Sequence, residues 1–249
     1  MGAGWRRFRR GVLACLVAVA VAVPAWAGPT YTVGVENTTY LPMYGVDERG
    51  RYTGAGRTLL DAFAREHAFS FDYVPLPVAR LFRRFFKGGL DFKFPDHPAW
   101  HKDRREGLDI AYAEALRYMD AVHVPPGRAQ EPPAAFDRVA LPVGFSVLPS
   151  VRRAGIERHP MHEIDAMIGA ALAGRVDGVF LASAVVNRRL DRMGREDALV
   201  PSRTMRKRGM YHLASQRHPA IVEKFARWRR EHADLVARIR ADWGLTRRR

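Results

Sequence analysis

The first half of the chain consists of short segments with alternating or helical apolar patterns. Residues 31–36 alternate apolar and polar side chains, which predicts a strand, and residues 69–75 repeat this pattern. Between them, residues 57–68 place Leu59 and Phe63 on one face of a helix. A strand, a helix and a second strand in this order predict an α/β unit with parallel strands.

A basic and aromatic stretch, RLFRRFFKGGLD, follows at residues 80–91. Basic residues interleaved with aromatic ones are typical of surfaces that bind single-stranded nucleic acid. Read as a helix from Val78, however, the stretch is amphipathic and ends at two glycines. Its apolar stripe consists of Leu81, Phe82, Phe85 and Phe86. The pattern predicts a buried aromatic face, and we expect no nucleic acid as a partner.

The second half of the chain repeats the α/β pattern after a proline-rich, linker-like stretch at residues 129–140. Before this stretch, residues 107–127 predict a strand, a turn and a second strand. After it, residues 161–174 predict a helix and residues 175–183 a strand. Residues 219–243 form a long amphipathic pattern, which predicts a helical region.

Together these patterns predict an α/β protein with two lobes. The first lobe is expected to contain residues 28–124 and 205–249, and the second lobe residues 125–204. The chain would cross between the lobes twice, near the boundaries of the second lobe.

The first 27 residues differ in composition from the rest. They begin with four arginines and no acid, continue with an apolar run of 14 residues, and place Ala25 and Ala27 before Gly28. This order is typical of a secretory signal peptide. A membrane span needs roughly 20 apolar residues, so a retained anchor is the weaker alternative. We predict cleavage after Ala27 and export to the periplasm.

Charge and cysteine content narrow the classes of function. The only cysteine, Cys15, lies in the predicted signal peptide, so the mature chain of 222 residues has no thiol nucleophile or thiolate metal ligand. The same cut removes four of the 41 basic residues and leaves 37 against 26 acidic ones, a formal charge of +11. Positive charge favours acidic partners in general, and export argues against nucleic acid among them.

The order of the segments resembles bacterial extracellular solute-binding protein family 3, the amino-acid-binding type of periplasmic receptor. The segments that carry the resemblance are TYLPMYGVDERGRYTGAGRTLLDAFA, FDYVPLPVARLFRRFFKGGLD, IAYAEALRYMDAVHV and LAGRVDGVFLASAVV, which together span essentially the whole mature chain. The resemblance implies a type II periplasmic binding-protein fold, in which two lobes close over a ligand.

Two departures from the family pattern concern the ligand. An acidic residue that holds the ligand's ammonium is expected five positions after Asp177, where this chain has Ala182 followed by Ser183. The threonine–arginine motif that holds the α-carboxylate is also replaced, by FKFPDHPAWHKDRR. A buried ammonium without a charged partner is costly. The resemblance therefore argues against an ordinary α-amino acid held in the usual way.

The resemblance implies three ligand contacts on loops. Tyr40 and Tyr44 lie after the first strand, where the family places an aromatic side chain that stacks on the ligand, and Ser146 lies where the second lobe offers hydroxyl and backbone donors. Local packing of the two tyrosines is the structural alternative.

Three further candidates lie in and after the basic stretch. Arg80 begins the predicted helix near the strand ends, where a guanidinium can clamp an anion. Asp96 can accept hydrogen bonds from hydroxyl or amine groups, and Trp100 can stack on a ring. The alternatives are an exposed arginine, an Asx-Pro turn and plain packing.

Histidine pairs raise the question of a metal. His97 and His101 are four residues apart but enclose a proline, His159 and His162 are three apart, and no third ligand lies at an informative spacing. We expect no metal and no cofactor.

The leading hypothesis is a non-catalytic, monomeric periplasmic receptor that delivers a small polar solute to a membrane permease of an ABC-type transporter or reports it to a sensor. One alternative is an exported dehydratase-like enzyme on the same fold, with Glu114 as the proton donor and Arg117 as the carboxylate clamp. Another is a basic scaffold without a ligand.

Overall fold

The computed structural model describes residues 28–246. The predicted signal peptide lies outside the described residues. None of the helices within 28–246 is long and apolar enough to cross a membrane.

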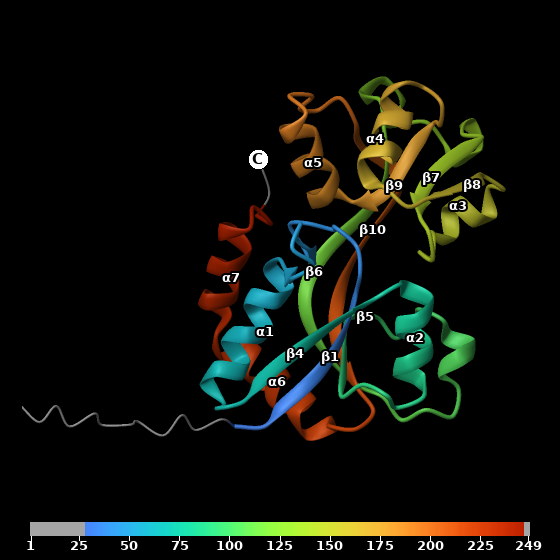
Figure 1. The fold of residues 1–249 in the computed structure, drawn as a ribbon. Helices are drawn as coiled ribbons and strands as arrows, with labels where there is room; N and C mark the ends of the chain where they lie inside the picture. The colour runs from blue at the N-terminus through green and yellow to red at the C-terminus, as the bar shows by residue number, and fades with distance from the viewer. Residues whose placement is uncertain (1–27, 247–249) are drawn as a thin grey trace, which may run out of the picture.

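One mixed sheet of eight strands runs through the whole molecule in the order β4-β1-β5-β10-β6-β9-β7-β8 (Figure 1). The lower lobe in Figure 1 contributes β1 (Thr30–Glu36), β4 (Ser70–Leu76) and β5 (Phe92–Asp96). The upper lobe contributes β7 (Arg138–Pro142), β8 (Glu157–Met161) and β9 (Gly178–Ala182). The predicted two-lobed α/β architecture is confirmed.

Helices cover both faces of the lower lobe. One face carries α1 (Ala55–Glu66), α6 (Pro219–Glu231) and α7 (Ala233–Asp242), and the other carries α2 (Val78–Phe86), as Figure 1 shows. A small hairpin of β2 (Gly45–Val46) and β3 (Tyr52–Thr53) precedes α1, and a short 3-10 turn (Lys102–Arg105) follows β5. The strand β1 precedes α1 in the chain and β4 follows it. As predicted, these two strands pair in parallel.

The upper lobe is smaller and has helices α3 (Pro149–Arg153), α4 (Ile164–Leu172) and α5 (Ser183–Arg192). Two 3-10 turns, Pro126–Arg128 and Pro133–Ala135, occupy the linker-like stretch before β7. Its own core packs β7, β9 and α3 around side chains such as Val139, Val151 and Phe180.

Two long antiparallel strands, β6 (Ala111–Val124) and β10 (Val200–Ser215), join the lobes. The end of β6 pairs with β9 of the upper lobe, and the end of β10 pairs with β5 of the lower lobe. The predicted strand, turn and strand over 107–127 is therefore wrong, because one continuous strand crosses between the lobes. The sheet continues through the crossing and does not mark where one lobe ends. The lobe boundaries at 124/125 and 204/205 therefore remain expectations from the sequence.

Helix α2 confirms the interpretation of the basic and aromatic stretch. The side chains of Leu81, Phe82 and Phe85 are buried, whereas Arg83 and Arg84 are exposed. Leu81 and Phe85 pack in one core cluster with Ala214 of the sheet, where apolar burial stabilises the lobe. The long C-terminal pattern is divided, because α6 and α7 meet at a break at His232.

Candidate functional site

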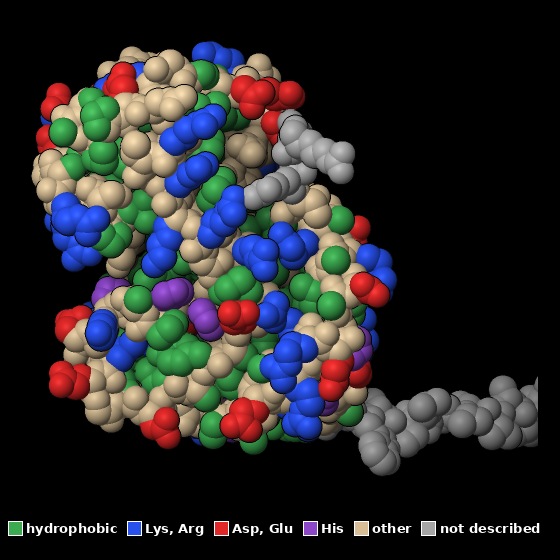
Figure 2. All heavy atoms as spheres, turned by 180° about the vertical axis from the view of Figure 1, so that it is seen from behind, with side chains coloured by type: hydrophobic (Ala, Val, Ile, Leu, Met, Phe, Trp, Pro, Cys, Tyr) green, Lys and Arg blue, Asp and Glu red, His purple; other side chains and the backbone are tan. Residues whose placement is uncertain are grey.

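A cavity of about 40 Å³ lies at the junction of the lobes and is lined by residues from both. The lower lobe and β10 contribute Glu36, Tyr44, Val78, Phe82, Trp100, His101 and Tyr211. The upper lobe and the end of β6 contribute Asp120, Gly144, Phe145, Ser146 and Phe180. Figure 2 shows the surface narrowing at the junction, where histidine and basic side chains are exposed.

The fold explains why these side chains meet. Glu36 is the last residue of β1, and the loop at residues 144–146 follows directly after β7. Val78 and Phe82 come from the first turns of α2, which follows β4. In open α/β sheets, ligands bind outside the carboxyl ends of the strands, and helix N-termini point there. The cavity lies at this place in the lower lobe.

Glu36 supplies a buried carboxylate on the lower side of the cavity. It is 3% exposed, and its Oε2 accepts a hydrogen bond of 3.0 Å from the hydroxyl of Tyr44. Burial raises the pKa of Glu36, while the positive charge of Lys93 and the Tyr44 hydrogen bond oppose this rise. The carboxylate is therefore partly compensated by its neighbours.

Asp120 supplies a second carboxylate, from the strand that joins the lobes. Its side chain lines the cavity, but its Oδ1 is buried and accepts no hydrogen bond from any described residue. Burial raises the pKa of Asp120 to about 7, and only the charge of Lys207 opposes this. A buried acceptor without a donor costs about 1–3 kcal/mol, more when it is charged. The Oδ1 of Asp120 is thus a polar atom of the cavity to which no described residue donates a hydrogen bond.

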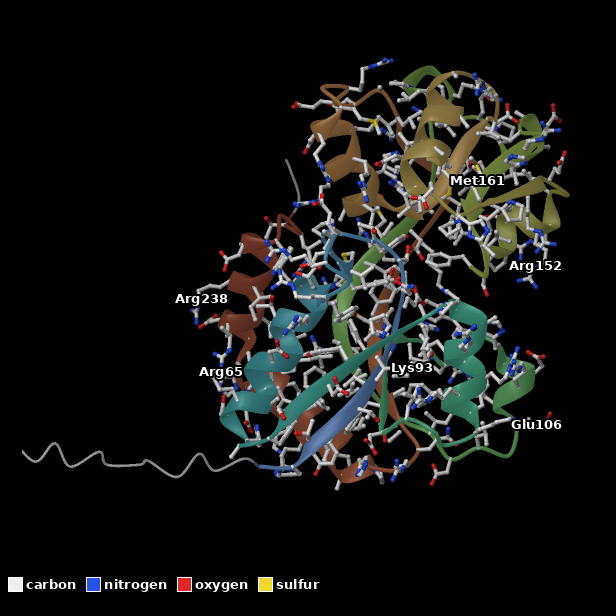
Figure 3. All side chains as sticks on the ribbon, viewed as in Figure 1. Arg65, Lys93, Glu106, Arg152, Met161 and Arg238 are labelled. Carbon is white, nitrogen blue, oxygen red and sulfur yellow. The ribbon has the colours of Figure 1, made fainter. Side chains whose placement is uncertain are left out.

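A buried ionic cluster lies beside the cavity, in the lower lobe. Arg105 donates two hydrogen bonds to the carboxylate of Asp96, at 2.7 and 3.1 Å. The Lys93 ammonium also contacts Asp96, at 3.3 Å, and donates to the carbonyl of Pro95. Figure 3 shows Lys93 inside the lobe, on the side of the sheet that α2 covers. Both carboxylate oxygens of Asp96 are therefore occupied by groups of the protein.

Three of the six predicted ligand contacts line the cavity, namely Tyr44, Trp100 and Ser146. The other three lie elsewhere. Arg80 is exposed on α2, and Asp96 belongs to the buried ionic cluster. Tyr40 is 1% exposed and stacks on Tyr44, and its hydroxyl accepts a hydrogen bond of 2.7 Å from the N–H of Ala182. Their roles in binding stay predictions.

The sequence interpretation missed both cavity carboxylates and most of the aromatic lining. The missed aromatic residues are Phe82, Phe145, Phe180 and Tyr211. A signal for Asp120 was available, because it interrupts the otherwise apolar end of a strand, YMDAVHV. Glu36 offered a similar signal, since it follows the apolar strand residues Val33 and Val35.

The histidines form no recognisable metal site. Within residues 28–246, no group of three or more histidine, cysteine, aspartate or glutamate side chains is arranged to hold a metal ion. His97 contacts the rings of Trp100 and His212, while His159 and His162 are exposed in the upper lobe. His101 lines the cavity, and burial lowers its pKa.

The residues considered for the dehydratase alternative lie outside the cavity. The carboxylate of Glu114 is 55% exposed and forms an ion pair of 2.8 Å with Arg229 on α6. Arg117 is exposed on the same strand. The structure does not bring them together with the cavity lining.

Comparison with known proteins identifies the architecture. The sequence matches no protein-family model and shows no detectable similarity to a curated protein. Its structure, however, is similar to many solved structures. An ancestral amino acid-binding protein, a precursor of cyclohexadienyl dehydratase, superposes with a TM-score of 0.66 at 15% identity over 86% of this chain and 95% of that chain. The chain has the type II periplasmic binding-protein fold.

Two further structures agree with this fold. A periplasmic His/Glu/Gln/Arg/opine family-binding protein from Silicibacter pomeroyi, in complex with lysine, gives a TM-score of 0.65 at 14% identity over 86% of this chain and 96% of that chain. The holo form of ArgBP from T. maritima gives 0.64 at 18% identity, over 81% and 89%. At these identities the likeness establishes the fold, and function has to be argued from the cavity.

Proposed function

We propose that this protein is a periplasmic receptor that binds a small polar solute between its lobes. The observation that carries the proposal is the cavity lined by both lobes, at the place where the paired strands β6 and β10 pass from one lobe to the other. Two strands that connect lobes in this way can act as a hinge, and closure over a ligand would bury it. The small volume of the cavity suits a solute of few non-hydrogen atoms.

The proposal includes the biological setting. Residues 1–27 would direct export and be removed, and the monomeric receptor would deliver its solute to an ABC-type membrane transporter or report it to a sensor. The chain would have no catalytic role, which agrees with the exposed, ion-paired position of Glu114.

The test is a thermal-shift screen of residues 28–249 with amino acids, small carboxylates, amines, polyamines and sugars. A ligand that binds only the folded state raises the melting temperature, by an amount that grows with its concentration. We expect one class of solute to do so. Trp100→Ala should abolish the shift of the best ligand, because Trp100 lines the cavity.

Trp243→Ala is the matched control. Its ring nitrogen donates to Thr58 on the outer face of the lower lobe, so the same substitution there should leave the shift intact. A protein that responds to no solute would be a scaffold, and the proposal would be wrong. Equal loss of the shift in both tryptophan variants would remove the cavity from the proposal.

A further inference from the structure

Two acidic side chains, Glu36 and Asp120, line the cavity. Two cations, Lys93 and Arg105, lie beside two anions, Glu36 and Asp96, and electrostatic interactions link Lys93 to both anions. Neither cation lines the cavity, and no other lysine or arginine within residues 28–246 does. The carboxylate of Asp120 remains, and the positive charge that acts on it is that of Lys207, which is exposed on β10 and outside the lining. Since the chain as a whole carries many more basic than acidic residues, this local negative charge runs against its average.

The remaining lining is well suited to a cation. Six of the lining residues are aromatic, and an aromatic ring face attracts ammonium groups. Phe82 already shows this attraction, because the Lys93 ammonium lies 4.1 Å from the centroid of its ring. Among the described residues, no arginine lines the cavity: Arg105 donates to Asp96, and Arg80 is exposed outside the lining.

We propose that the cavity selects a small organic amine, whose ammonium pairs with Asp120, and that it rejects solutes whose binding depends on a carboxylate. This inference rests on the proposed receptor function and specifies the class of its solute. It assigns to Asp120 the attractive contact and the specificity, because a ligand carboxylate would meet the carboxylates of Glu36 and Asp120. The cation that acts on Asp120, Lys207, is exposed and does not line the cavity.

The test uses four solutes with the same four-carbon chain: n-butylamine, 1,4-diaminobutane, 4-aminobutanoate and butanedioate. Isothermal titration at pH 8 measures their dissociation constants. We expect at least one of the two amines to bind, 4-aminobutanoate to bind more than about tenfold more weakly, and butanedioate not to bind. Tighter binding of butanedioate or 4-aminobutanoate would overturn the inference, as would binding of 4-aminobutanoate together with failure of both amines.

Asp120→Asn provides the second arm of the test. The substitution keeps the size of the side chain and removes its charge, so the affinity of the binding amine should fall by about 30-fold or more. Asp72→Asn is the matched control, because Asp72 is exposed on β4 and should leave the affinity unchanged. Circular dichroism verifies that both variants are folded. Unchanged amine affinity in Asp120→Asn would overturn the assignment.

The two proposals fail in distinguishable ways. If a neutral or anionic solute binds, loses affinity in Trp100→Ala and is unaffected by Asp120→Asn, the receptor function stands and the amine inference is wrong. If no solute in the wider screen changes the melting temperature, the receptor function fails and the amine inference fails with it.

Discussion

At the scale of single residues, Asp120 combines a stability cost with a position suited to binding. The groups that face its carboxylate are the exposed Lys207 and the hydroxyls of Tyr40, Tyr118 and Tyr211. None of them donates a hydrogen bond to Oδ1. Uncompensated buried charges destabilise the folded state, and functional sites are where such groups cluster.

This arrangement predicts a pH-dependent stability. The pKa of Asp120 rises from its ordinary 3.8 to about 7 on folding, so the folded state loses stability as the pH rises from about 4 to about 7. The loss is at most about 4 kcal/mol. Asp120→Asn should therefore increase the free energy of unfolding at pH 8 and change it little at pH 4. Urea denaturation at both pH values measures this.

Asp72→Asn serves as the control for this pH effect, because no comparable burial affects Asp72. An Asp120→Asn variant with the same stability difference at pH 4 and pH 8 would contradict the assignment of an elevated pKa.

At the scale of elements, local pattern and tertiary packing agree for most helices and disagree for β6. In the first part of β6 the exposed Glu114 and Arg117 interrupt the burial, whereas its last four residues are all buried. The strand β9 pairs with β6 at residues 120–123. In the sequence, a polar and apolar part followed by an apolar part looks like two segments with a turn between them. The continuous strand arises because both lobes supply partners for it.

Packing also overrides helix propensity at Gly56 in α1. A Cβ at Gly56 would lie 2.3 Å from a ring atom of the buried Phe94. Gly56→Ala should therefore destabilise the protein by about 1–3 kcal/mol, although alanine is the better helix former. Thermal or urea unfolding measures the change.

Gly169 in α4 offers the matched case. A Cβ there meets no atom within 4 Å, so Gly169→Ala should stabilise the protein by about 0.5–1 kcal/mol. Equal effects of the two substitutions would mean that packing against Phe94 does not decide the outcome.

At the scale of the whole molecule, polar contacts join the lobes in addition to the two long strands. The hydroxyl of Tyr40 in the lower lobe accepts a hydrogen bond from the N–H of Ala182 in the upper lobe. Arg189 on α5 donates a hydrogen bond of 3.1 Å to the carbonyl of Thr39. The ring of Tyr40 also contacts that of Phe145. These contacts hold the lobes together around the cavity.

Tyr40→Phe should weaken the closed arrangement of the lobes. The substitution leaves the N–H of Ala182 without its acceptor, at a cost of about 1–3 kcal/mol. Because this hydrogen bond crosses between the lobes, the open arrangement should gain population and the radius of gyration in small-angle scattering should increase. Tyr52→Phe is the control, since the buried hydroxyl of Tyr52 has no hydrogen-bond partner in the described part of the chain. No difference between the two variants would contradict a closing role for Tyr40.

The sequence by itself determined the order of the α/β units, the buried aromatic face of α2 and the two-lobed fold class. These features depend on periodicity within short segments, which local sequence records directly. It also suggested Tyr44, Trp100 and Ser146, which the structure places in the lining of one cavity.

Only the tertiary structure decided which polar groups meet. Glu36 and Asp120 lie far apart in the chain and come together because β1 and β6 belong to one sheet. Asp96, an equally plausible ligand contact in the sequence, is occupied by Arg105 from the following turn. Whether a carboxylate is free or paired depends on long-range contacts and on burial, and a local pattern contains neither.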